Sequence, residues 1–163
     1  MNYGKINKVD IANGPGVRVS LFVSGCNHKC KGCFNPETWN FNYGQRFTLN
    51  TIDDIYDAMI EDHISGLTVL GGEPLDVRNV KIVTQLCRII KSQTSGKSIW
   101  IYTGYRYEDV KHLEIMRYID VLVDGPFIED LKDISLKFRG SSNQRIIDIQ
   151  KSRELDRIVL WEE

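Results

Sequence analysis

Short apolar segments typical of β-strands alternate along the chain with segments that have the spacing of amphipathic helices. The strand-like segments are rich in β-branched residues and end at glycine or at polar turn residues. They cover residues 17–23, 66–70, 98–102 and 119–123. Strands separated by helices predict right-handed crossover connections and a parallel sheet with helices on at least one face.

Three helices are expected between these strands. The first begins at Thr51, which is followed by Asp54 in a variant of the capping box. The second has apolar residues at helical spacing between residues 80 and 90 and a glycine stop near Gly96. The third is expected over about residues 108–118, where the apolar residues again recur at helical spacing.

The length of the chain limits how many such units it can hold. A closed barrel of eight strand–helix units takes about 250 residues, whereas this chain has 163. The expected fold class is therefore α/β, an open partial (β/α) barrel of about five or six mostly parallel strands. It would form one domain over residues 1–163, with a core at about 15–145 and further strands at 145–149 and 157–161. Its open side would admit a bulky substrate, such as a loop of another protein.

Composition and charge exclude several classes of protein. The chain is 42% hydrophobic and 26% charged, which is ordinary globular usage and excludes a largely disordered chain. The net charge of -1, with no block of like charges, gives no indication of a nucleic-acid or anionic-membrane partner. No apolar run approaches the roughly 20 residues of a membrane span, and the first residues lack a signal-peptide pattern. A cytoplasmic location is therefore expected.

Three of the four cysteines lie close together, directly after the first predicted strand. Cys26, Cys30 and Cys33 have the spacing C-x3-C-x2-C, which in a reducing compartment indicates metal binding or redox chemistry rather than disulfides. Structural zinc sites and electron-transfer [4Fe-4S] clusters take four ligands. A [4Fe-4S] cluster held by three cysteines would keep one iron open. The alternative is a structural zinc knuckle completed by one of four other residues, namely His28, His63, His112 or Cys87.

Several of these residues also have simpler interpretations. His28 lies inside the cysteine segment, where we expect it to donate a hydrogen bond or to position the loop rather than to bind metal. Cys87 lies on the apolar side of the second predicted helix, as a buried small hydrophobic residue does. Trp39 and Trp100 are expected in the core or in the wall of the barrel.

A second motif, Gly71-Gly72-Glu73-Pro74, follows the second predicted strand. Together with the cysteine triplet it resembles the radical S-adenosylmethionine superfamily, whose GGE motif contacts the methionine amino group of the cofactor. Other segments narrow the resemblance to glycyl radical enzyme activases, and among them to the branch that serves anaerobic ribonucleoside-triphosphate reductase. Gly32 stands where the superfamily often has an aromatic residue, and this glycine fits the branch. The other matching segments are 13–18, 24–35, 38–39, Trp100, 103–105, 120–125 and 139–145.

The resemblance implies a radical oxidoreductase with a partial barrel of the superfamily type. Cys26, Cys30 and Cys33 would hold a [4Fe-4S] cluster, and S-adenosylmethionine would bind its open iron. An outside one-electron donor, such as a flavodoxin or a similar reductase system, would allow cleavage to methionine and a 5'-deoxyadenosyl radical. That radical would form a glycyl radical on the large subunit of the reductase. No catalytic residue is expected beyond the cluster ligands; contacts to S-adenosylmethionine are expected from Gly32, Cys33, Phe34, Gly71, Gly72 and Glu73.

Two alternative functions and one unassigned segment complete the interpretation. The chain would otherwise be an activase for another glycyl radical enzyme, or a non-enzymatic zinc or iron–sulfur module. Residues 139–145, from Arg139 to Arg145, form a polar segment. It is either a solvated loop with an exposed positive face or a segment that docks the reductase or closes over the cofactor.

Overall fold

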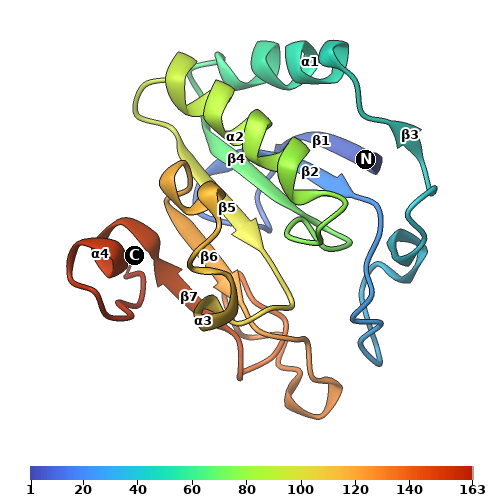
Figure 1. Ribbon diagram of the computed structural model, residues 1–163, viewed down its shortest axis with the longest axis vertical. Coiled ribbons are helices and arrows are strands. Elements are labelled where there is room, and N and C mark those ends of the chain that lie inside the picture. The colour runs from blue at the N-terminus through green and yellow to red at the C-terminus, as the bar shows by residue number, and fades with distance from the viewer. Residues whose placement is uncertain (163) are drawn as a thin grey trace.

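The computed structural model describes residues 1–162 and contains a seven-stranded mixed sheet in the order β3-β1-β2-β4-β5-β6-β7 (Figure 1). The four central strands β2, β4, β5 and β6 are parallel, whereas β1, β3 and β7 pair in antiparallel fashion with their neighbours. The α/β class and the open sheet are thus as expected. The strands are β1 (Asn2–Asp10), β2 (Val17–Val23), β3 (Gln45–Arg46), β4 (Ile64–Gly71), β5 (Ser98–Tyr102), β6 (Val121–Asp124) and β7 (Arg145–Asp148).

Two longer helices and several short ones connect the strands. No helix within residues 1–162 is both long and apolar enough to cross a membrane. The α-helices are α1 (Leu49–Met59), α2 (Val80–Gln93), α3 (Tyr107–Val110) and α4 (Ile149–Glu154). The 3-10 helices are η1 (Pro36–Trp39), η2 (Glu114–Arg117) and η3 (Glu129–Leu131).

Successive side chains of the central strands point to opposite faces of the sheet and so contribute to two separate apolar clusters. In β5, Ile99 and Ile101 join the large cluster that includes the buried faces of α1 and α2. Trp100 points to the other face, where it forms a second cluster with Val121 and Val123 of β6. Because successive side chains of a strand point to opposite faces, one strand supports both clusters. Trp100 is therefore buried, as expected for a core aromatic residue.

The amino-terminal strand β1 and the start of α1 differ from the sequence-based expectation. No strand was expected over Asn2–Asp10, yet β1 pairs with both β2 and β3, which brings the sheet to seven strands. Helix α1 has Thr48 as its N-cap, and the capping box joins Thr48 to Thr51 rather than Thr51 to Asp54. The threonine hydroxyl does there what a Glu or Gln side chain does in the common form of the box.

The third expected helix and the last expected strand are also wrong in part. In place of one helix over residues 108–118, the chain forms the single turn of α3 and the 3-10 helix η2, with residues 111–113 between them and Leu113 in an extended conformation. Apolar residues spaced by three fit a 3-10 helix as well as an α-helix. Strand β7 is present at its expected position. Residues 157–161, in contrast, contribute only one isolated bridge, between Leu160 and Ile147.

A buried arginine joins the first three parallel strands. The guanidinium of Arg18, on β2, donates to the Thr68 hydroxyl at 2.7 Å and to the Ser98 carbonyl at 3.0 Å. It also lies 5.4 Å from the ring centre of Trp100. Burial lowers the pKa of Arg18 to about 10, so the side chain is still a cation at neutral pH.

Gly66 leaves the room that this arrangement needs. A Cβ atom at Gly66 would lie 2.0 Å from the Ser98 carbonyl oxygen and 2.8 Å from the Arg18 Nη2 atom. We expect Gly66→Ala to lower the free energy of unfolding by about 1–3 kcal/mol, because the pairing of β4 with β5 must open to admit the methyl group. Urea denaturation measures this difference. The exposed substitution Lys81→Ala is the control and should stay within about 0.5 kcal/mol; an equal effect of both would contradict the steric argument.

Candidate functional site

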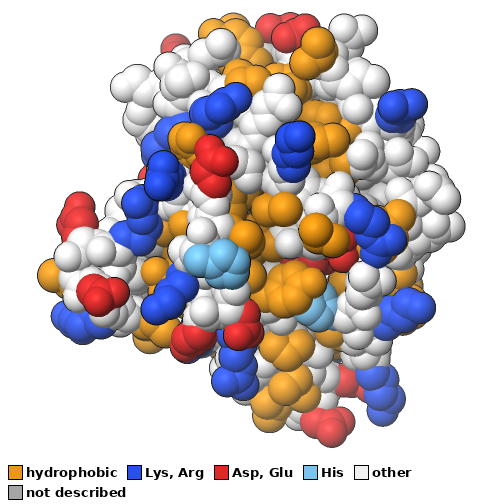
Figure 2. Space-filling model, viewed as in Figure 1, with side chains coloured by type: hydrophobic (Ala, Val, Ile, Leu, Met, Phe, Trp, Pro, Cys, Tyr) orange, Lys and Arg blue, Asp and Glu red, His pale blue; other side chains and the backbone are white. Residues whose placement is uncertain are grey.

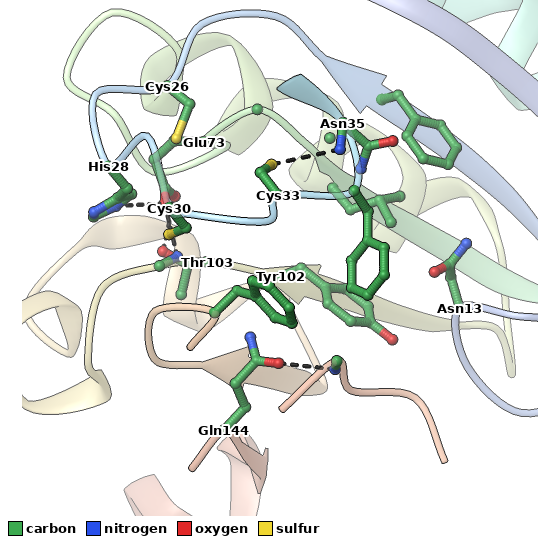
Figure 3. Close-up of a pocket in the computed structure, with 18 of the residues that line it drawn as sticks. Asn13, Cys26, His28, Cys30, Cys33, Asn35, Glu73, Tyr102, Thr103 and Gln144 are labelled. Carbon is green, nitrogen blue, oxygen red and sulfur yellow. Dashed lines mark hydrogen bonds and ion pairs between the residues drawn. The ribbon is translucent and has the colours of Figure 1, made fainter. Parts of the chain in front are cut away.

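The loops that follow β2, β4 and β5 meet at one edge of the sheet, because parallel strands end on the same side. A cavity of about 530 Å³ opens between these loops, the segment 12–13 and the segment 136–144. Figure 3 shows Cys26, Cys30 and Cys33 at one end of the cavity and Asn13 and Gln144 away from them. The structure thus brings the cysteine segment and the GGE segment to one place.

The three cysteines lie on an irregular loop and are partly exposed. Lys29 and Gly32 both have positive φ, of 48° and 72°, which turns the chain back between successive cysteines. Burial raises the pKa of Cys26 and of Cys30. Both are therefore thiols near neutral pH, and a bound cation would be needed to hold them as thiolates.

The donor set suits a cluster better than a single ion. Within residues 1–162, no three His, Cys, Asp or Glu side chains converge closely enough to hold one metal ion. A [4Fe-4S] cluster binds each thiolate on a different iron, so its ligands stand further apart around a larger volume. The three cysteines line one cavity that has such a volume. Trp39 lines the same cavity and is partly buried, so it is not a core residue. Its indole N–H group is buried and has no hydrogen-bond partner among the described residues.

The candidates for a fourth zinc ligand lie elsewhere or are already engaged. Cys87 is completely buried in the large core cluster, as expected, and burial raises its pKa to about 12. His63 and His112 are exposed in other loops. His28 lines the cavity, but its Nε2 atom is 2.9 Å from a Glu73 carboxylate oxygen.

The two glycines of the GGE segment permit a close approach of two strand ends. Gly71 has a φ of 103°, and a Cβ atom there would lie 2.8 Å from the backbone of Phe22. A Cβ atom at Gly72 would lie 2.7 Å from the Gly25 carbonyl oxygen. The Glu73 backbone N–H then donates to that same oxygen at 2.8 Å. Both glycines line the cavity, and their contact with a cofactor stays a prediction.

Glu73 is almost completely buried, with 1% of its surface exposed, and its carboxylate accepts four hydrogen bonds from the protein. Thr103 Oγ1 and the Leu75 N–H donate to one oxygen at 2.8 and 2.9 Å. His28 Nε2 and the Gly104 N–H donate to the other at 2.9 and 2.8 Å. The hydrogen bond to Glu73 raises the pKa of His28. A carboxylate so fully engaged has little capacity left for a cofactor ammonium group.

Gly32 and Phe34 contact the segment that follows β6. A Cβ atom at Gly32 would lie 2.7 Å from a carboxylate oxygen of Glu129. Phe34 is 60% exposed, and its ring centre lies 5.0 Å from that of Phe127. Phe34 and Phe127 both line the cavity, so an aromatic pair borders it beside the last cysteine.

The segment 139–145 is held by its own hydrogen bonds rather than being a free positive face. The Gln144 side-chain oxygen accepts from the N–H groups of Gly140 and Ser141 at 2.9 and 3.1 Å, and Arg139 donates to the Gln144 carbonyl at 2.7 Å. Arg145 pairs with Asp124 and with Glu108. Arg139, Gly140 and Gln144 also line the cavity.

Comparison with known proteins identifies the family. Residues 12–147 match the model of a 4Fe-4S single cluster domain. A protein of Enterobacteria phage T4 is 45% identical over 146 residues, which cover 90% of this chain and 93% of the relative. A protein of Escherichia coli strain K12 is 45% identical over 148 residues (88% and 96%), and one of Vibrio cholerae 42% over 150 residues (90% and 97%). All three are named anaerobic ribonucleoside-triphosphate reductase-activating protein.

The chain belongs to this family of activating proteins. The resemblance to the branch that serves anaerobic ribonucleoside-triphosphate reductase, inferred from the further matching segments, is therefore confirmed. The matched residues 12–147 include the cysteine loop, the GGE segment and the segment 139–145. The sequence interpretation missed Thr103 and Gly104 as partners of Glu73. Their signal was the segment 103–105, whose resemblance to the activases had no residue role attached to it.

Proposed function

We propose that the chain is the activase of an anaerobic ribonucleoside-triphosphate reductase and acts as a radical S-adenosylmethionine enzyme. The observation that carries the proposal is that three cysteines, and no fourth one among residues 1–162, line one cavity at the ends of parallel strands. Cys26, Cys30 and Cys33 would hold a [4Fe-4S] cluster. Once bound and reduced by an outside one-electron donor, such a cluster would supply the electron for cleavage of S-adenosylmethionine to methionine and a 5'-deoxyadenosyl radical, and that radical would take a hydrogen atom from a glycine of the reductase.

The residues of the chain bind and orient the reactants and exclude water. Gly71 and Gly72 offer backbone close to the start of the cysteine loop, while Gly32, Cys33 and Phe34 offer backbone at and beside the last ligand. Apolar cavity-lining side chains limit the access of water to a reactive radical. They include Phe22, Leu70, Phe127, Leu136 and Phe138.

The proposed partner is the large subunit of the reductase, in keeping with the names of the relatives. Exposed apolar side chains next to the cavity support a protein partner: Ile128, Leu131 and Ile134 are exposed, Ile134 by 94%. In Figure 2, hydrophobic side chains form a band that reaches the lower end of the face shown, where the loop between β6 and β7 lies in Figure 1. The proposed electron donor is a flavodoxin or a similar reductase system.

The proposal is tested by anaerobic reconstitution with iron and sulfide, followed by metal analysis. The reconstituted protein is then reduced with dithionite in the presence of S-adenosylmethionine. We expect about four irons per chain and equal amounts of methionine and 5'-deoxyadenosine by chromatography. Addition of the large reductase subunit should produce the EPR doublet of a glycyl radical.

Two outcomes would contradict the proposal in different ways. Stoichiometric zinc without 5'-deoxyadenosine would identify a structural metal module. Cofactor cleavage with a glycyl radical only on another glycyl radical enzyme, such as one of the formate-lyase type, would keep the chemistry and change the partner.

A further inference from the structure

The side chain of His28 leaves the cysteine loop and inserts between the ends of β4 and β5. Its Nε2 atom donates to Glu73, and its ring lies edge-on to the ring of Tyr105, with centres 4.6 Å apart. Figure 3 shows the imidazole pointing from the cysteine loop toward Glu73. We call Glu73 and residues 103–105 the histidine seat.

Each residue of the segment 103–105 contributes differently to the seat. Thr103 donates its hydroxyl to one Glu73 oxygen, and Gly104 donates its backbone N–H to the other, which fixes the orientation of the carboxylate. A Cβ atom at Gly104 would lie 2.6 Å from the His28 ring, so this position must lack a side chain for the imidazole to fit. Tyr105 then covers one edge of the ring.

The seat lies where the cysteine loop most needs support. His28 stands between Cys26 and Cys30, next to Lys29 with its left-handed backbone. Such a backbone conformation is unfavourable for a residue other than glycine and persists only when its surroundings hold it. Asn27 supplies a second connection, because its amide donates to Asp76 at 3.1 Å. Two successive side chains between the first two cysteines are thus anchored to the segment after β4.

From this geometry we propose that His28 is a positioning residue, which holds Cys26 and Cys30 in place through the histidine seat before and after the cluster binds. The inference rests on the proposed function only in assuming that the loop carries a cluster. It gives Glu73 an indirect part in the site, as the group that orients His28. It also gives the segment 103–105 a role, which is to support His28, that does not depend on contact with the cofactor.

The first test uses iron-free, fully reduced protein and therefore does not depend on the cluster. Iodoacetamide alkylation of each cysteine is followed over time by peptide mass spectrometry. In His28→Ala we expect Cys26 and Cys30 to react about tenfold faster than in the wild type, because the loop loses a hydrogen bond to a charged group and opens more often. Cys87 reports on folding and should stay unreactive. The control His63→Ala, in an exposed loop, should match the wild type at every cysteine.

A second set of variants separates the seat from a general loss of stability. Gly104→Ala should expose Cys26 and Cys30 as His28→Ala does, because the new methyl group displaces the ring. In the double variant the methyl group has nothing to displace, so the effects should not add. His28→Gln, whose amide can also donate to Glu73, should recover most of the protection. If His28→Ala also makes Cys87 reactive, the variant is partly unfolded and the other two variants are compared instead. Faster alkylation of Cys26 and Cys30 in Gly104→Ala, with near wild-type rates in His28→Gln, then supports the seat, and wild-type rates in Gly104→Ala contradict it.

The third measurement follows iron loss from reconstituted protein to a chelator under anaerobic conditions. We expect His28→Ala and Gly104→Ala to lose iron about tenfold faster than the wild type, in the range of losses that follow removal of a group supporting a metal ligand. If the wild type binds no iron and sulfide, the proposed function fails, and the alkylation result still decides whether the seat holds the loop. If the wild type binds a cluster and both variants match it in alkylation and iron retention, His28 has no positioning role.

Discussion

Replacement of Cys30 by alanine is expected to abolish cluster binding and the cleavage of S-adenosylmethionine. Only two of the three thiols that line the cavity would remain, and Cys87 is completely buried in the core on helix α2. We expect 5'-deoxyadenosine formation to fall by more than about a hundredfold, because removal of a supporting group alone costs up to that factor. Reconstituted protein is assayed for iron, sulfide and 5'-deoxyadenosine.

The matched control is Cys87→Ala, which removes a cysteine of the same chain from the core on helix α2. Cys87 is completely buried, and its side of the helix packs in the large cluster. This variant should keep the wild-type iron content and activity, with a modest loss of stability. Four irons per chain in Cys30→Ala, or loss of iron in Cys87→Ala, would overturn the ligand assignment.

A second large effect is expected from Trp100→Ala. Trp100 is 1% exposed, and its ring centre lies 5.0 Å from that of Trp161 and 5.7 Å from that of Phe138. Its removal would open a cavity in the second cluster and take away the ring beneath Arg18. We expect the free energy of unfolding to fall by about 3–5 kcal/mol, a large part of the total of a typical domain.

Urea denaturation followed by far-ultraviolet circular dichroism measures this loss without depending on tryptophan fluorescence. The control is Leu49→Ala at the exposed start of α1, which should change stability by less than about 0.5 kcal/mol. A loss below about 1 kcal/mol in Trp100→Ala would mean that the second cluster is not tightly packed in solution.

The central sheet and the cysteine loop could be predicted because their signals are local. The apolar, β-branched segment 17–23 and the C-x3-C-x2-C spacing that follows it are each complete within a few residues. Strand β1 gives no such signal, since Lys5 and Lys8 interrupt it and most of its residues are half-buried or exposed. Its pairing partners β2 and β3, which lie later in the chain, decide its conformation.

The role of Glu73 could not be predicted because its partners are distant in sequence. His28 precedes it by 45 residues, and Thr103 follows it by 30. A glutamate in a turn after a strand is compatible with a solvated carboxylate, a cofactor contact or a buried acceptor. Only the meeting of three strand ends at one edge of the sheet distinguishes these possibilities.

The histidine seat also limits how the site could be transplanted into another scaffold. A designer who copied only the segment with the three cysteines would leave behind Glu73, which belongs to a second loop, and Gly104, which belongs to a third. Engineered sites often fail because the groups supporting the ligands are left to chance. A transferable unit must therefore include the loops at the carboxyl ends of three neighbouring parallel strands, with glycine kept at position 104.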